Sequence, residues 1–209
     1  MNKNYTLFNL DELEKRKTSN QQEFEDKNFH LLTALPDMVK RSFERLNKEI
    51  LAITEIVSRE KNLSADAISG YLKGELIKAF PEYCGEATPS RFKLKSPNNG
   101  EWIYVKKLFK CKGGYTPKNG YSKNNEKIYN QRSDEPADIS PNIFIGYVAN
   151  DEMTDAIGVF AICKDGDEIK WVSDLSSLAA KQKTTMVMEV VKKETKLKDG
   201  LLKLKKKVN

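Results

Sequence analysis

The sequence predicts an α+β protein in which a helical N-terminal half, about residues 10–80, packs on an antiparallel sheet. The sheet is expected from residues 90–110, 143–173 and possibly 184–191. Two observations carry this prediction. Apolar residues recur every three or four positions up to residue 80, and aromatic or β-branched runs separated by turn sequences follow. The 209 residues include 9 Phe, 8 Tyr and 2 Trp, which suffices for a hydrophobic core.

Two helices are predicted in the N-terminal half. Between Pro36 and Asn62 the apolar positions fall on one helical face, and Pro36 suits the first turn of a helix. A second helix is expected to start at a Ser64 cap and to stop at Pro81. We expect residues 1–84 to form this helical region.

The remainder, residues 85–209, is expected to be mainly β and to form one compact globular unit with the helices. Alternation at 91–95, a turn containing Asn99 and Gly100, and the run at 102–105 predict a hairpin. Continuous apolar runs at 143–148 and 156–163 predict interior strands covered on both faces.

The end of the chain carries further turn and cap signals. Asp165 and Gly166 are expected to turn the chain into a strand at 168–172, and Asp174 is expected to cap a short helix at 175–181.

Two segments have less regular signals. Residues 111–141, rich in Gly, Pro, Asn, Ser and Lys, predict a long mobile loop. Residues 192–209 are compatible with a helix, a hairpin or a disordered tail.

The net charge of +6 is distributed in blocks. Residues 85–132 hold 11 basic and 3 acidic side chains, residues 133–180 hold 2 and 10, and residues 181–209 hold 10 and 3. A basic block is expected of a protein that binds nucleic acid or another anionic surface. Either the acidic segment neutralises its basic neighbours, or it lies behind them and leaves a cationic face open.

Basic residues alternate with tyrosines in the first basic block. Cations neutralise phosphates and exposed tyrosine rings stack on unpaired bases, so this pattern favours contact with a nucleic-acid strand, DNA or RNA. Our main hypothesis is a non-enzymatic nucleic-acid-associated protein, encoded by a bacterium or by a mobile element such as a phage or plasmid. The candidate binding residues are Lys93, Lys95, Lys106, Lys107, Lys110, Lys112, Tyr115, Lys118, Tyr121, Lys123, Arg132, Lys203, Lys205 and Lys206.

Residues 46–110 resemble a winged helix-turn-helix: a helix, a short turn, a second helix and a basic hairpin at 91–107. In that family the second helix enters the major groove and the wing contacts the backbone. Here the second helix carries Lys73 and Lys78 but no Arg or Gln to contact base edges, so sequence-independent contact is favoured.

Two alternatives remain open. The protein could be an inhibitor or accessory module that docks a protein partner through its charged blocks. It could also be a metal-dependent nuclease, because Asp155, Glu168 and Lys170 resemble the PD-(D/E)xK pattern, in which two acids hold a divalent cation. Against this, a tight turn before Glu168 would leave the two acids roughly 25–30 Å apart along a strand.

Several classes are disfavoured. His30 is the single histidine, no phosphate-binding glycine loop is present, and Cys84, Cys111 and Cys163 lie far apart. We therefore expect no cofactor or resident metal, and the sequence disfavours an enzyme. No apolar run reaches the roughly 18 residues of a membrane span, and no secretory segment is visible, so a cytoplasmic location is expected. Oligomeric state is left open.

Overall fold

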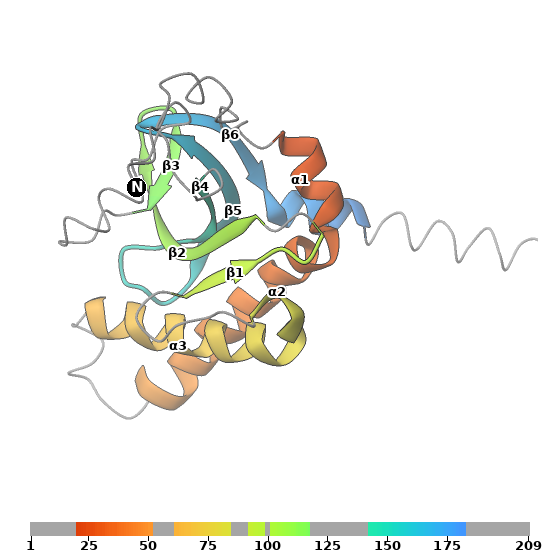
Figure 1. Cartoon of the computed structure of the whole chain (residues 1–209). Helices are drawn as coiled ribbons and strands as arrows, with labels where there is room; N and C mark the ends of the chain where they lie inside the picture. Colours follow the sequence, from red (N-terminus) through yellow and green to blue (C-terminus); the bar gives the residue numbers. More distant parts are fainter. Residues whose placement is uncertain (1–19, 52–60, 85–91, 99–100, 118–141, 183–209) are drawn as a thin grey trace, which may run out of the picture.

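The computed structural model describes residues 20–51, 61–84, 92–98, 101–117 and 142–182 (Figure 1). Helices and strands are both present, which confirms the α+β prediction. The helical elements are α1 (Gln21–Lys27), α2 (Phe29–Arg45), the π-helix η2 (Leu46–Leu51), α3 (Lys61–Ala79) and the 3-10 helix η4 (Pro81–Tyr83). The strands are β1 (Lys93–Lys95), β2 (Trp102–Cys111), β3 (Gly114–Pro117), β4 (Asn142–Ala149), β5 (Ala156–Asp165) and β6 (Glu168–Asp174).

Asparagine side chains lie at both ends of α1. The Asn20 side chain accepts hydrogen bonds from the backbone N–H groups of Gln22 and Glu23, and so caps the start of α1. At the other end, the buried Asn28 amide donates to the Phe24 carbonyl and accepts from the Tyr83 hydroxyl. These bonds satisfy a polar group that would otherwise be costly to bury.

The expectation that Pro36 starts a helix is wrong, because Pro36 lies inside α2. A proline there removes one backbone hydrogen bond and costs about 3 kcal/mol in an isolated helix. The preceding turn nevertheless stays helical because Leu31, Leu32 and Leu35 are fully buried. Burial of these three leucines outweighs the local preference of the proline.

The second predicted helix is confirmed, with a shifted start. α3 begins at Lys61, so Ser64 is a buried residue inside the helix and not its cap. α3 ends at Ala79, before Pro81, as predicted. The last part of the first predicted helix, residues 52–60, lies outside the described residues.

The described sheet has the strand order β1-β2-β4-β5-β6, and β3 pairs with the second half of β2. The β1–β2 hairpin and the antiparallel β4–β5 and β5–β6 pairs agree with the prediction. The β2–β4 pair is parallel, so the prediction of a purely antiparallel sheet is wrong. A parallel pair needs a long connection, and the 30 residues between Cys111 and Asn142 provide one.

The predicted loop at 111–141 also needs correction at its start. Residues 114–117 form β3, because the turn glycines Gly113 and Gly114, both with positive φ, send the chain back along β2. The rest of that predicted loop, the possible strand at 184–191 and the segment 192–209 all lie outside the described residues. The Asp174 cap is confirmed, since its Oδ1 accepts from the backbone N–H groups of Ser176 and Ser177 at the start of a helical segment, 175–182.

The two faces of the sheet carry two separate clusters of buried side chains. One face packs against α1, α2 and α3 and forms the larger cluster, to which Leu35, Leu72 and Ile103 belong. The opposite face forms a small cluster around Tyr104, Leu108, Phe144 and Ile162. β4 and β5 contribute to both clusters, which confirms that they are interior strands. The sheet is strongly curved, and β3 comes back into contact with β6 (Figure 1).

Among the described helices, none combines the length and apolar character that crossing a bilayer would require.

Candidate nucleic-acid interface

Four of the predicted lysines lie on one face of the β1–β2 hairpin. Lys93 and Lys95 pair across the strands with Tyr104 and Trp102. Directly opposed residues of an antiparallel pair share a face, and residues two apart along a strand do so as well. Lys106 and Lys110 of β2 therefore lie on the same face, the one opposite the helices. We call Lys93, Lys95, Trp102, Lys106 and Lys110 the lysine face.

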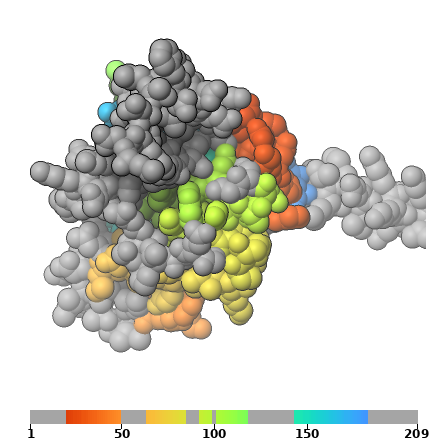
Figure 2. All heavy atoms as spheres, in the orientation of Figure 1, coloured from red at the N-terminus to blue at the C-terminus, as the bar shows by residue number. Residues whose placement is uncertain are grey.

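The Trp102 ring makes cation–π contacts with two of these ammonium groups. The Nζ of Lys93 lies 3.6 Å from the centroid of the Trp102 ring, and the Nζ of Lys95 lies 5.3 Å from it. Such cation–π contacts hold the ammonium groups near one aromatic surface at the edge strand β1. Figure 2 shows residues of this green-coloured region exposed between α1 and the α3–η4 region.

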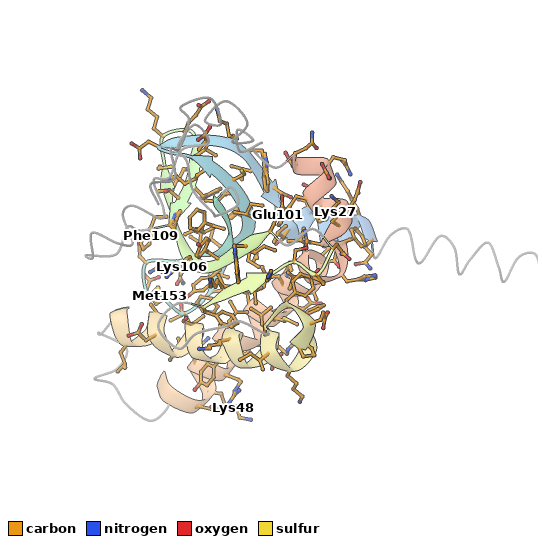
Figure 3. The ribbon with its side chains drawn as sticks, in the orientation of Figure 1. Lys27, Lys48, Glu101, Lys106, Phe109 and Met153 are labelled. Atoms are coloured by element: carbon orange, nitrogen blue, oxygen red, sulfur yellow. The ribbon has the colours of Figure 1, made fainter. Side chains whose placement is uncertain are left out.

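Two other predicted lysines lie elsewhere. Lys107 points to the helix side of the sheet, where its Nζ lies 2.8 Å from the Met153 Sδ and 5.0 Å from the Phe109 ring centroid. Figure 3 labels Lys106, Phe109 and Met153 in this part of the molecule. Lys112 is exposed in the turn between β2 and β3. Because successive side chains of a strand point to opposite faces, Lys106 and Lys107 lie on different sides of the sheet although the sequence pattern grouped them.

Tyr115 is not the open stacking surface that the sequence suggested. Its position on β3, opposite Lys110, turns its ring towards the small cluster. There it stacks on Phe160 with ring centroids 4.0 Å apart. The remaining predicted binding residues lie outside the described residues: Lys118, Tyr121, Lys123, Arg132, Lys203, Lys205 and Lys206.

The hairpin does not project as a wing. β2 forms ladders with β1, β3 and β4, so it is an integral strand of the sheet. Two charged side chains of α3 make contacts within the protein, while Lys78 is exposed. The Lys73 ammonium lies over the Phe92 ring, and Glu75 accepts two hydrogen bonds from Arg41. The resemblance to a winged helix-turn-helix therefore ends at the order of the elements.

The nuclease pattern does not come together in space. Glu168 pairs with Lys170 at 2.7 Å beside the β5–β6 turn, and this hydrogen bond raises the pKa of Lys170. Asp155 lies at the opposite end of β5, where it accepts a hydrogen bond from the Ala156 N–H. Within the described part of the chain, no three His, Cys, Asp or Glu side chains are placed to hold a metal ion.

Two described carboxylates of the acidic segment are paired within that segment. Asp165 and Glu168 both contact Lys170, which belongs to the same segment. The β4–β5 turn, with its three acidic residues, packs towards the helices, where the Asn47 side chain donates to the Thr154 carbonyl. This arrangement favours the hypothesis in which the acidic segment lies apart from the lysine face.

One feature was missed by the sequence analysis. Lys164, at the end of a long apolar run, is only 5% exposed and lines a pocket of about 710 Å³. A register shift between Cys163 and Lys164 accompanies this placement. A lysine directly after an apolar strand was the available signal, but it equally suits an exposed residue at a strand end.

No family model matches the chain, and no curated protein and no solved structure matches it.

Proposed function

We propose that this protein binds single-stranded nucleic acid along the lysine face. The strand register supports this proposal, because it places four lysines from two adjacent strands on one face, with Lys93 and Lys95 against the Trp102 ring. Along the strands, Lys95, Lys93 and Lys106 occupy positions roughly 7 Å apart, and Lys110 lies roughly 13 Å beyond Lys106, so phosphates of an extended strand can contact them in succession.

An unpaired strand is favoured over a duplex for two reasons. The lysine face belongs to a curved sheet, and α3, the helix in the position of a recognition helix, carries no Arg or Gln to contact base edges in a major groove. The half-buried Trp102 ring lies between the cations, and aromatic rings on a sheet can stack on bases that are not paired. Affinity would come mainly from phosphates, so little sequence preference is expected.

The activity that we propose is binding without catalysis. The three cysteines of the chain, Cys84, Cys111 and Cys163, are free. Free thiols support a reducing compartment, and we place the activity in the cytoplasm.

The experiment is a fluorescence anisotropy titration of a labelled oligothymidylate of about 20 nucleotides at about 50 mM salt. The test variant is the double substitution Lys93→Ala and Lys95→Ala. A matched control, Lys40→Ala with Lys78→Ala, removes the same charge from exposed positions on α2 and α3.

We expect the test variant to bind about 10-fold or more weakly than the wild type, at about 1 kcal/mol for each lost charge-assisted contact. The control variant should bind within about 2-fold of the wild type, because its lysines are on the helix side. Equal losses in the two variants would contradict the proposal. Absence of binding at about 50 mM salt would also contradict it and would favour a protein partner.

A further inference from the structure

A second site, distinct from the lysine face, is a pocket between the β2–β3 turn and the β5–β6 turn. The pocket of about 710 Å³ falls within the usual range of small-molecule sites, roughly 300–1,000 Å³. Its lining comes from β2, β3, β5, β6 and the turns between them: Phe109, Cys111, Lys112, Thr116, Pro117, Lys164, Asp167 and Ile169. None of these residues belongs to the lysine face.

Lys164 is the unusual member of this lining. Lys164 is only 5% exposed, and among the described residues its ammonium group makes no hydrogen bond. That group is not sealed in the interior but faces the pocket, where the Asp167 carboxylate interacts with it electrostatically. Buried lysines are normally paired, because an uncompensated charge in a protein interior is expensive. Burial lowers the pKa of Lys164, while the nearby Asp167 carboxylate opposes that shift. An anion in the pocket would supply the missing partner.

The other lining residues define what kind of anion fits. Lys112 adds a second, exposed cation from the β2–β3 turn, and the two lysines outweigh the single carboxylate of Asp167. A phosphate monoester, with close to two negative charges and three acceptor oxygens, can contact both ammonium groups. Phe109 and Ile169 provide apolar surface for the rest of the molecule, and Phe109 is an exposed ring.

We propose that this pocket binds a nucleotide, with its phosphate against Lys164 and Lys112 and its base on the Phe109 side. The choice of a nucleotide among phosphate monoesters rests on the function proposed above. The nucleotide has two possible sources, which share this chemistry: the 5′-phosphorylated end of a bound strand, or a free mononucleotide.

The first test is calorimetric titration with adenosine 5′-monophosphate, adenosine and inorganic phosphate as separate probes. The monophosphate should bind about 10-fold or more tightly than either fragment, because only it engages both the cations and the apolar lining. Lys164→Met should weaken monophosphate binding about 10-fold or more, whereas Lys40→Met, an exposed control on α2, should leave it unchanged. Wild-type affinity in Lys164→Met, or no binding at about 10 mM monophosphate, would overturn the proposal.

A stability measurement shows that any loss is not misfolding. Lys164→Met replaces a buried charge with an apolar side chain of similar length, so its melting temperature should rise by about 2–4 °C. A variant that is more stable and yet binds the monophosphate more weakly identifies Lys164 as a binding residue. Should Lys164→Met fail to fold, Lys112→Ala in the exposed turn provides the second test, with an expected loss of about 3-fold or more.

The two possible sources of the nucleotide are distinguished by comparing oligothymidylates with and without a 5′-phosphate. A 5′-phosphorylated oligothymidylate that binds more tightly than its 5′-hydroxyl form, through Lys164, identifies the strand end as the occupant. Equal binding of the two forms, with the monophosphate still bound, identifies a free nucleotide. Monophosphate binding without any strand binding would refute only the function proposed above, whereas strand binding that depends on Lys93 and Lys95, without monophosphate binding, would refute only this pocket.

Discussion

The two faces of the sheet differ in what they bury. We call the face that packs on α1, α2 and α3 the helix side, and the other one the opposite face. The helix side buries a long series of aliphatic and aromatic residues, and the buried Asn28 side chain there donates to the Phe24 carbonyl and accepts from the Tyr83 hydroxyl. The opposite face has a small cluster of four buried residues and carries the lysine face. Because apolar burial is the main stabilising contribution in folding, we infer that the helix side contributes most of the stability.

Two glycines, one in the sheet and one on a helix, show a second contrast at the level of single atoms. A Cβ atom on Gly146 of β4 would lie 1.6 Å from the Lys106 carbonyl oxygen of β2, whereas a Cβ on Gly74 of α3 would meet no atom within 4 Å. The parallel β2–β4 pair is therefore an obligatory close approach of two backbones, and α3 has room to spare on its outer surface.

The largest expected effect comes from Gly146→Ala. The new methyl group would force β2 away from β4, because a backbone atom cannot move aside as a flexible side chain can. We expect a loss of about 3 kcal/mol or more in the free energy of unfolding, measured by urea denaturation. A loss below about 1 kcal/mol would show that the two strands do not approach so closely.

Leu35→Ala tests the claim that the helix side carries the stability. Leu35 is fully buried in the larger cluster, so its truncation should cost about 2–5 kcal/mol in the free energy of unfolding. Under conditions where the variant is still folded, its affinity for the oligothymidylate should equal that of the wild type. A large loss of affinity in the folded variant would contradict the division between the two sides.

Lys164→Met is expected to raise the free energy of unfolding, whereas Gly146→Ala and Leu35→Ala lower it. Because burial lowers the folded-state pKa of Lys164 below its ordinary value of 10.5, the unfolded chain binds more protons between these two pKa values. Wild-type stability should therefore rise with pH in that window, and the rise should be lost as the pH falls through the lowered pKa. At about pH 7 the variant should be more stable by about 1 kcal/mol, which matches the expected rise of about 2–4 °C in its melting temperature.

The pH scan is controlled by taking, at each pH, the difference in the free energy of unfolding between Lys164→Met and the wild type. The advantage of Lys164→Met over the wild type should shrink as the pH approaches 10.5, because groups common to both proteins cancel. An advantage that stays constant with pH would mean that Lys164 is not a buried charge.

Gly74→Ala is expected to have the smallest effect. The position is helical and exposed with open space around it, so alanine should stabilise the protein by about 0.4–1 kcal/mol, chiefly by restricting the unfolded chain. Thermal denaturation of Gly74→Ala and Gly146→Ala under the same conditions compares the same substitution at an open and at a crowded position. A destabilised Gly74→Ala would indicate that the outer surface of α3 is covered.

The sequence predicted those features that depend on neighbouring residues. The β1–β2 hairpin, the end of α3 before Pro81 and the cap by Asp174 all follow from local turn and cap chemistry. Features that depend on distant residues were missed. Pro36 is tolerated inside α2 because of tertiary packing, and the parallel pairing of β2 with β4 joins segments on either side of a long connection.

The candidate sites follow the same rule. The composition of residues 91–132 indicated a basic surface, but only the strand register divided Lys106 from Lys107 and turned Tyr115 inwards. The pocket at Lys164 depends on four strands and two turns meeting at one end of the sheet. No local pattern could have predicted that meeting.

The salt dependence of strand binding tests the central claim most directly. For single strands, the slope of log affinity against log salt concentration changes by about 0.7 for each phosphate contact. We predict that Lys93→Ala with Lys95→Ala reduces this slope by about 1.4, and that Lys40→Ala with Lys78→Ala leaves it unchanged. Identical slopes in the wild type and in both double variants would contradict binding through the lysine face.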